Sequence, residues 1–248
     1  MLSDTMKPTV AVLLAAFNGM RWIEEQISSI LEQDKVKIAL FISVDQSTDG
    51  TYEWCKELEN TCSNVYVLPY GERFGGAAKN FFRLIHDVSI EQYDYVALSD
   101  QDDIWLSDKL SHAISLIQDK NLDAMSSDVI SFWDDGREVL VRKSYPQRKF
   151  DYLFEAAGPG CTYVFKSSSL SEFKTFLSKY HDQVNGVSLH DWMIYAYFRS
   201  RGLHWHIDDV PLMRYRQHEN NQVGSNTNIS SYVKKLMMIN YGWYCNEG

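Results

Sequence analysis

Continuous apolar runs that alternate with amphipathic segments constrain the fold of this chain more than any other feature. Val10–Ala16 and Ile38–Val44 consist almost entirely of apolar residues. Such runs are typical of parallel strands that are buried on both faces of a sheet. The same reasoning predicts two shorter strands, at Val65–Leu68 and Tyr95–Leu98. The first hundred residues therefore contain four predicted strands.

The segments between these strands have the apolar spacing of helices. Ile23, Ile27 and Ile30 recur at intervals of four and three residues, after Asn18, a residue type that can cap a helix. Further helices are predicted over Tyr52–Leu58, over Gly75–Val88 and after a cap at Ser107. This alternating order predicts an α/β protein in which a mostly parallel sheet is flanked by helices.

The second half of the chain is less regular. Asp134-Asp135-Gly136 separates two short apolar runs and predicts a β-hairpin with strands at Val129–Phe132 and Glu138–Val141. The other elements predicted here are strands at Cys161–Phe165 and Leu203–Ile207 and helices at Ser168–Leu177 and His190–Arg201. Because no repeat or linker interrupts the sequence, we expect one continuous domain over residues 1–224, with residues 225–248 as a C-terminal extension.

The charge and the hydropathy of the chain exclude two classes of protein. With 24 Lys and Arg against 33 Asp and Glu, the net charge is −9. Nucleic-acid binding needs a basic surface that replaces counterions, so we expect no nucleic-acid partner. No stretch of 18 apolar residues and no N-terminal signal segment occurs. We therefore expect a cytoplasmic protein that does not span a membrane.

The most acidic loop follows the fourth predicted strand. Asp100, Asp102 and Asp103 place three carboxylates within four residues. Ionised carboxylates at this spacing repel one another, and a divalent cation removes that cost. Oxygen ligands suit Mg²⁺ or Mn²⁺, and Mg²⁺ is commonly shared between carboxylates and substrate phosphates. The alternative is a solvated acidic turn before the next helix.

Two other loops follow strands of the same predicted sheet. Ala15-Ala16-Phe17-Asn18-Gly19 ends the first strand, and its small residues leave room for a ligand to approach the backbone. Asp45 ends the second strand, where its carboxylate could accept a hydrogen bond from a base. Ligands of parallel sheets bind at the carboxyl ends of the strands, near a topological switch point. The alternative for Asp45 is an ordinary turn.

Six segments in this order resemble the family-two glycosyltransferases of the GT-A fold. They are AAFNG (Ala15–Gly19), VDQSTDGT (Val44–Thr51), SDQDDIW (Ser99–Trp105), GCTYVF (Gly160–Phe165), HDW (His190–Trp192) and YRQHENNQVG (Tyr215–Gly224). The third, fifth and sixth segments look particularly like the rhamnosyltransferase-like branch that builds bacterial surface polysaccharides. The resemblance covers roughly the first 220 residues.

The resemblance implies a fold and a reaction. The fold would be a Rossmann-like GT-A sheet with a smaller acceptor-side portion, in which residues 1–120 bind the nucleotide and residues 121–224 bind the acceptor. The reaction would be inverting transfer of a sugar from a nucleoside-diphosphate donor to a hydroxyl of a saccharide acceptor. The implied donor is dTDP-L-rhamnose, the implied acceptor is lipid-diphosphate-linked, and the product would belong to an O-antigen or capsule.

The resemblance also implies which residues bind the donor. The nucleotide-binding residues would be Ala16, Phe17, Asn18, Asp45, Asp100, Gln101 and Arg216. The DxD motif of the family maps to Asp100 and Asp102, and these two with His218 would hold Mg²⁺ or Mn²⁺. Asp103 would assist or substitute as a ligand. One departure from the family pattern is a single acid, Asp45, where a pair is usual.

The catalytic base implied by the family lies at the start of a later helix. The matching residue is Asp191, which would accept the proton of the attacking hydroxyl. His190 stands where the family usually has an acid, so His190 is a rival for the role of base. Taken alone, an aspartate at a helix start is often only an N-cap.

Three other functions fit parts of the sequence. A UDP-hexose transferase would use the same fold and the same loops. A nucleotidyltransferase would also use acidic metal ligands, but it would need a basic, glycine-rich first loop that this chain lacks. A carbohydrate-binding protein with a degenerate GT-A fold would not need Asp100, Asp102 and Asp191.

The C-terminal stretch Ser231–Tyr244 combines Lys234 and Lys235 with Met, Ile, Tyr and Trp residues. Basic and aromatic residues both favour a bilayer surface, so this stretch could hold the protein peripherally on the cytoplasmic face of the inner membrane. The alternatives are a helix that closes the fold and a contact in a dimer. The oligomeric state is therefore left open.

Overall fold

A computed structural model describes residues 7–184 and 186–218, in which the predicted α/β architecture is confirmed. Seven strands form the main sheet in the order β10-β6-β9-β4-β1-β2-β3. Their bounds are β1 Thr9–Ala16, β2 Lys37–Val44, β3 Val65–Val67, β4 Tyr95–Ser99, β6 Ala124–Ser127, β9 Val164–Lys166 and β10 Trp205–Asp208. Only β9 runs antiparallel to its neighbours, β4 and β6. The sheet is therefore mostly parallel.

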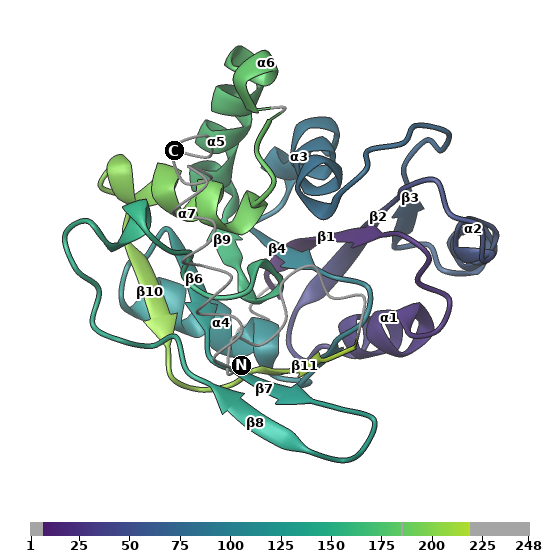
Figure 1. The fold of residues 1–248 in the computed structure, drawn as a ribbon, viewed down its shortest axis with the longest axis horizontal. Coiled ribbons are helices and arrows are strands. Elements are labelled where there is room, and N and C mark those ends of the chain that lie inside the picture. The colour runs from purple at the N-terminus through teal and green to yellow at the C-terminus, as the bar shows by residue number, and fades with distance from the viewer. Residues whose placement is uncertain (1–6, 185, 219–248) are drawn as a thin grey trace, which may run out of the picture.

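Helices cover both faces of this sheet (Figure 1). The bounds are α1 Ile23–Leu31, α2 Thr51–Thr61, α3 Ala77–Asp87, α4 Lys109–Asp119, α5 Ser167–Lys179, α6 His181–Val184 and α7 His190–Ser200. Alternate residues of β1 point to opposite faces. Val12 and Leu14 pack with α1, α2 and α4, whereas Ala11 and Leu13 pack with α3, α5 and α7. This double burial explains why the strand is apolar from Val10 to Ala16.

The order in which successive strands are added to the sheet reverses beside β1. After β1 it adds β2 and β3 on one side, and it then returns to place β4 on the other side. Strands β1, β2 and β4 are parallel, so their carboxyl ends meet at one edge. This edge is a topological switch point, where open α/β sheets bind their ligands.

A second, smaller sheet adds a wall beside that edge. Its order is β5-β11-β7-β8, with bounds β5 Ile104–Trp105, β7 Val129–Phe132, β8 Glu138–Val141 and β11 Met213–Arg216. The predicted hairpin is confirmed, since β7 and β8 pair antiparallel. Pairing of β11 with β5 brings residues after 216 next to the acidic loop that precedes β5.

Four local predictions are wrong in detail. The predicted strand Cys161–Phe165 begins as a 3-10 turn over Gly160–Thr162. Asn18 does not cap α1, which starts at Ile23. Ser107 does not cap α4, because Asp108 stands at its N-cap. The helix predicted from Gly75 starts at Ala77, and Gly75 adopts the left-handed φ of 75° that favours glycine.

Three short 3-10 helices complete the described elements, at Ile90–Gln92, Asp151–Leu153 and Gly160–Thr162. No helix among the described residues is long and apolar enough to cross a bilayer. The C-terminal stretch for which membrane or dimer contact is predicted lies outside the described residues, as does the extension over residues 225–248. Strands from both halves of the chain share the main sheet, and the single domain over residues 1–224 stays a prediction.

Candidate active site

The loops after β1 and β4 are joined by a two-way hydrogen-bonded contact. The Gln101 side chain accepts from the Phe17 amide at 2.8 Å and donates to the Phe17 carbonyl at 2.9 Å. This pairing leaves the Phe17 ring 51% exposed at the edge of the sheet. Gln101 therefore acts through the backbone of the first loop, whose predicted role is to hold the nucleotide.

Gly19 allows this contact. A Cβ at Gly19 would lie 2.3 Å from Oε1 of Gln101, far closer than atoms pack. The Gln101 side chain is flexible, so it would move away at little cost in stability. A residue larger than glycine at position 19 is therefore incompatible with the pairing but compatible with the fold.

Replacing Gly19 with Ala is expected to weaken donor binding by roughly tenfold, because it breaks hydrogen bonds that together contribute about 1–2 kcal/mol. The melting temperature should hardly change. Calorimetric titration of the donor measures the effect. Gly186→Ala is the matched control, since an added Cβ there meets no atom within 4 Å. Unchanged affinity in Gly19→Ala would show that the Gln101 contact does not shape the donor site.

Asn18 connects the loops after β1 and β2. Its amide donates to Oγ of Ser47 at 3.0 Å, and its side-chain Oδ1 accepts from the amide of Thr48 at 2.8 Å. The left-handed φ of 46° at Asn18 is a conformation that asparagine tolerates. The structure therefore gives Asn18 a loop-bridging role, and contact with the nucleotide stays a prediction.

Asp45 is buried at the end of β2, with 4% of its surface exposed. Its two carboxylate oxygens accept from the amides of Phe74 and Gly75, each at 2.9 Å. These bonds fix the loop that precedes α3. Oδ1 also accepts from the amide of Gln46 at 2.7 Å, whereas Oδ2 keeps a further lone pair, so binding of Oδ2 to a base is chemically open and stays a prediction.

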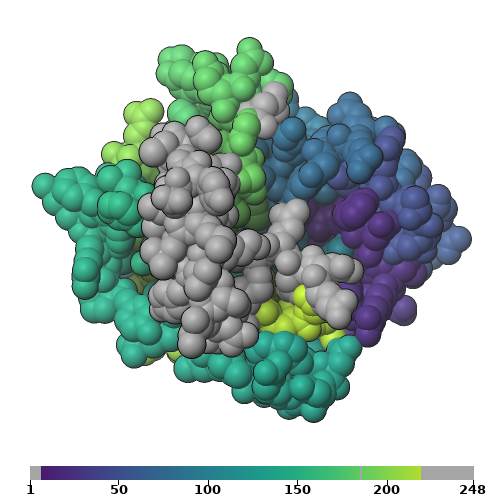
Figure 2. Space-filling view, viewed as in Figure 1, coloured from purple at the N-terminus to yellow at the C-terminus, as the bar shows by residue number. Residues whose placement is uncertain are grey.

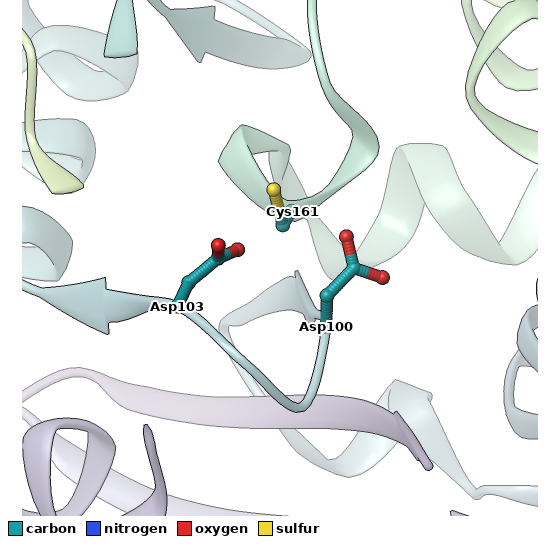
Figure 3. Close-up of side chains that lie close together, drawn as sticks. All are labelled: Asp100, Asp103 and Cys161. Atoms are coloured by element: carbon teal, nitrogen blue, oxygen red, sulfur yellow. The ribbon is translucent and has the colours of Figure 1, made fainter. Parts of the chain in front are cut away.

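The acidic loop places two carboxyl groups against a thiol (Figure 3). Asp100 and Asp103 lie on the loop between β4 and β5, and Cys161 approaches them from the 3-10 turn. One ligand atom of each of these residues lies within 4.8 Å of the other two. Asp103 and Cys161 are fully buried, whereas Asp100 is partly buried.

Burial and mutual repulsion disfavour the charged forms of these acids. Desolvation, followed by the Asp102 charge, raises the pKa of Asp100 to about 7. The same two causes raise the pKa of Asp103 well above its usual range. Desolvation also raises the pKa of the Cys161 thiol. The loop therefore favours binding of positive charge.

Asp102 and His218 lie together in the structure. Nε2 of His218 is 2.8 Å from Oδ2 of Asp102, and the imidazole ring stacks on Trp22 with the ring centroids 4.1 Å apart. The contact joins the acidic loop to the residues after β11. The two residues are 116 positions apart in the sequence.

A divalent cation fits these residues. Oδ2 of Asp103 is buried without a hydrogen-bond partner among the described residues, and neighbouring carboxylates raise each other's pKa. Carboxylate oxygens with one imidazole suit Mg²⁺ or Mn²⁺, whereas a protonated thiol such as Cys161 is a poor ligand for either. Asp100, Asp102 and His218 would hold the ion, and this ligand set stays a prediction.

Arg216 supports the acidic loop and is only 8% exposed. Its backbone amide donates to Asp103 at 3.1 Å, and its Nε donates to the carbonyl of Asp102 at 2.9 Å. Its guanidinium also forms an ion pair with Glu25 of α1. These bonds position the acidic loop, and direct contact of Arg216 with the donor stays a prediction.

Asp191 stands at the start of α7, where the sequence places it. Its Oδ1 accepts from the amide of Trp192 at 2.8 Å. Desolvation raises the pKa of Asp191 to about 6. The pKa of Asp100 is raised mainly by desolvation and then by the Asp102 charge, and the Asp191 charge makes a smaller contribution in the same direction. Asp191 also lies beside Gly160, where an added Cβ would lie 3.3 Å from the Asp191 Cβ, and the adjacent Cys161 faces Asp100 and Asp103, so the predicted base lies near the acidic loop.

His190 is a packing residue. Its ring stacks on Phe81 with the centroids 4.1 Å apart. A Cβ at Gly160 would lie only 2.5 Å from Nε2 of His190, so the glycine gives the ring its space. Desolvation lowers the pKa of His190 to about 3. These contacts favour Asp191 over His190 as the base.

Two residues near the site have no predicted role. Lys109 of α4 is buried, its Nζ lies 3.9 Å from the centroid of the Trp105 ring, and desolvation lowers its pKa to about 8. The thiol of Cys161 lies within 4.8 Å of a carboxyl oxygen of Asp100 and of Asp103. Cys161 belongs to the GCTYVF segment, whereas no sequence pattern indicates that the side chain of Lys109 is buried.

A groove of about 480 Å³ opens beside His218. It is lined by Arg21, Trp22, Trp133, Asp134, Asp135, Gln217 and His218. Figure 2 shows the end of the described chain in yellow, between the teal β7–β8 hairpin and the purple N-terminal part. The groove has room for a sugar-sized group next to the predicted metal ligands.

The chain belongs to glycosyl transferase family 2, whose sequence profile matches residues 11–174. It is 48% identical over 235 residues to the dTDP-rhamnosyl transferase RfbG of Shigella flexneri, covering 94% of this chain and 81% of the relative. It is 25% identical over 169 residues to the UDP-Glc:alpha-D-GlcNAc-diphosphoundecaprenol beta-1,3-glucosyltransferase WfgD of Escherichia coli, covering 66% of this chain and 62% of the relative.

Solved structures agree with the GT-A fold. Residues 1–349 of S. aureus TarS in complex with UDP match with a TM-score of 0.62 at 16% identity, over 84% of this chain and 60% of that one. The mannosyltransferase PcManGT of Pyrobaculum calidifontis, in complex with GDP-Man and Mn²⁺, matches with a TM-score of 0.58 at 18% identity, over 94% of this chain and 65% of that one.

Proposed function

We propose that this protein is an inverting rhamnosyltransferase that transfers L-rhamnose from dTDP-L-rhamnose to a hydroxyl of a saccharide acceptor in O-antigen synthesis. The identity of 48% to the dTDP-rhamnosyl transferase of Shigella flexneri over nearly the whole chain supports this donor. Membership of family 2 supports glycosyl transfer over the nucleotidyltransferase and the non-catalytic alternatives.

One observation carries the proposal. Asp191 lies beside Gly160, where an added Cβ would lie 3.3 Å from the Asp191 Cβ, and the thiol of the next residue, Cys161, lies within 4.8 Å of a carboxyl oxygen of Asp100. A base must lie beside the bound donor if it is to deprotonate a hydroxyl that attacks the sugar. The fold brings the two groups together by setting α7 beside the carboxyl end of β4.

The proposed displacement uses Asp191 directly. As the acceptor oxygen bonds to C1 of the sugar, its proton moves to the Asp191 carboxylate, and the bond from C1 to the diphosphate oxygen breaks with its electron pair on the diphosphate. A single displacement of this kind inverts the configuration at C1, by analogy with inverting glycosidases. No covalent sugar–enzyme intermediate is needed.

The acidic loop serves the leaving group. When bound, Mg²⁺ or Mn²⁺ supplies positive charge that offsets the negative charge of the departing diphosphate. Asp100, Asp102 and His218 would hold the ion. Gln101 and Arg216 keep the loop in place, because the first fixes it to Phe17 and the second bonds to Asp102 and Asp103. The mannosyltransferase structure with Mn²⁺ supports a divalent cation in this fold.

The proposed acceptor is a saccharide linked to a lipid diphosphate. The E. coli relative, whose name specifies a diphosphoundecaprenol acceptor, supports this class. Such an acceptor is held in a membrane, so we place the reaction at the cytoplasmic face of the inner membrane. Within that scheme, the residues of the 121–224 half would bind the acceptor and those of the 1–120 half the nucleotide.

The rate of transfer is expected to fall as the pH drops below about 6. Asp191 acts as a base only when ionised, and desolvation raises its pKa to about 6. Above that pH most Asp191 side chains are ionised, so the ionisation of Asp191 should no longer change the rate. Below it, the ionised fraction and the rate should fall about tenfold per pH unit. Initial rates at saturating donor between pH 4.5 and 8 test this, and a rate that is constant down to pH 5 would contradict it.

Thermal stabilisation by a panel of sugar nucleotides tests the donor. With Mn²⁺ present, dTDP-L-rhamnose is expected to raise the melting temperature more than UDP-glucose or UDP-GlcNAc at the same concentration, because stabilisation of the native state grows with the logarithm of the ligand's affinity. Stabilisation by the UDP sugars alone would favour the UDP-hexose alternative. Stabilisation by none of them would contradict the proposal.

A further inference from the structure

The five most exposed large apolar side chains among the described residues all lie in one short segment. They are Phe154 at 72%, Tyr145 at 61%, Leu140 at 56%, Leu153 at 54% and Phe150 at 52% exposure. We call residues 140–154 the basic-aromatic loop. Apolar groups gathered in this way on the surface of a soluble domain mark an interaction site.

The same loop is basic in a protein that is otherwise acidic. It contains Arg142, Lys143, Arg148 and Lys149 and a single acid, Asp151, whereas the whole chain has a net charge of −9. Within the described part of the chain, none of the four cations forms an ion pair. Asp151 is already paired with Arg199, with 3.1 Å between Nη1 and Oδ1. Lys143 acts electrostatically on Asp191, whereas Arg142, Arg148 and Lys149 have no acidic partner among the described residues and present positive charge to the surroundings.

Cations and rings alternate on the loop. The guanidinium of Arg142 lies 5.0 Å from the centre of the Tyr145 ring, and the ammonium of Lys149 lies 5.0 Å from the centre of the Phe150 ring. Side chains that combine an apolar body with a charged or polar end are suited to the boundary between lipid and water.

Hydrogen bonds hold the backbone of the loop and leave these side chains outside. The buried carboxylate of Asp128 accepts from the amide and the hydroxyl of Ser144, each at 2.8 Å. Arg199 donates to the carbonyl of Arg148 at 3.0 Å. Trp192 donates to the carbonyl of Tyr152 at 2.7 Å. The loop is thus a fixed platform on the protein surface.

This platform adjoins the proposed catalytic base. Trp192, which holds the loop through Tyr152, directly follows Asp191 in α7. Lys143 packs near Gly158, where an added Cβ would lie 3.4 Å from its Cγ. In Figure 1 the loop leaves β8 and runs along the outer edge of the molecule before the chain returns to β9. A surface bound to this loop would therefore lie next to the acceptor side of the site.

We propose that the basic-aromatic loop docks the protein on an anionic phospholipid bilayer, with Phe150 and Phe154 in the interface and Arg142 and Lys149 against the headgroups. Charge complementarity favours a bilayer as the partner, because the loop carries net positive charge in a chain whose net charge is −9. That docking delivers the acceptor to Asp191 rests on the proposed function, whereas the docking itself does not.

Flotation of the full-length protein with vesicles tests the docking without any sugar present. We expect binding to vesicles of about 30% phosphatidylglycerol in phosphatidylcholine and none to pure phosphatidylcholine at about 0.1 M salt. Each basic residue near such a surface contributes roughly fivefold to the partition coefficient, so Arg142→Gln with Lys149→Gln should lower it by roughly 25-fold. Phe150→Ser with Phe154→Ser should lower it by at least about tenfold.

Lys179→Gln with Tyr180→Ser is the matched control. It removes a lysine that lies 5.2 Å from an aromatic ring outside the loop, and binding should stay within about twofold of the wild type. Equal binding to both vesicle types, no binding by the wild type, or wild-type binding by the loop variants would overturn the proposal. Transfer to a water-soluble acceptor is measured separately. Failure of that transfer with normal flotation rejects the proposed function, and the reverse result rejects the docking.

Discussion

Asp191→Asn is expected to reduce sugar transfer by at least about 100-fold while donor and metal affinity stay close to those of the wild type. Asparagine keeps the size of the side chain and can still accept from the Trp192 amide, but it cannot take a proton from the acceptor. The loss should therefore appear in turnover at saturating donor. Calorimetric titration of the donor provides the second readout.

His190→Gln is the control for this prediction. Because His190 stacks on Phe81 in the interior, its replacement should lower the melting temperature and reduce turnover less than Asp191→Asn does. The two side chains are adjacent on a helix and point about 100° apart, so they cannot both approach one acceptor oxygen. Normal transfer by Asp191→Asn together with an inactive, folded His190→Gln would identify His190 as the base.

Asp102→Ala is expected to abolish cation-dependent transfer, which we take as a loss of at least about 1,000-fold. The variant removes a proposed metal ligand and leaves His218 without its 2.8 Å contact to the acidic loop. Donor turnover as a function of Mn²⁺ concentration measures the effect, and Mn²⁺ titration in the absence of donor shows whether the ion itself is lost.

Asp108→Ala is the matched control for the metal. Asp108 is exposed, lies six residues further along the same segment, and makes no side-chain cap bond to α4. Its replacement should leave both the Mn²⁺ affinity and the turnover within about twofold of the wild type. Full activity of Asp102→Ala in excess EDTA would contradict the proposed role of the cation.

Most of the fold follows from apolar periodicity. Val10–Ala16 and Ile38–Val44 identify the two central strands because burial on both faces leaves Ser43 as the one polar residue in the two segments. The order of elements then places the polar loops after β1, β2 and β4 at one edge. Short or irregular elements are harder to predict from the sequence. The 3-10 turn at Gly160–Thr162, for example, depends on tertiary contacts rather than on a local sequence pattern.

The site could be predicted as a set of residues but not as a set of contacts. The family motifs name both Asp102 and His218 as metal ligands, and in the structure the two side chains are in contact. No periodicity indicates that both oxygens of Asp45 bind backbone amides, or that Arg216 turns toward Glu25 and the acidic loop. Such contacts depend on side-chain direction across long sequence separations, which residue type and spacing do not determine.

The central claim, inverting transfer from dTDP-L-rhamnose, is tested most directly by following the anomeric proton of the sugar by NMR during turnover. The wild-type protein with Mn²⁺, dTDP-L-rhamnose and a soluble analogue of the lipid-linked saccharide should form a product whose anomeric configuration is opposite to that of the donor. Release of dTDP should match product formation one to one. A product with the configuration of the donor, or a donor that stays intact while a UDP sugar is consumed, would contradict the account.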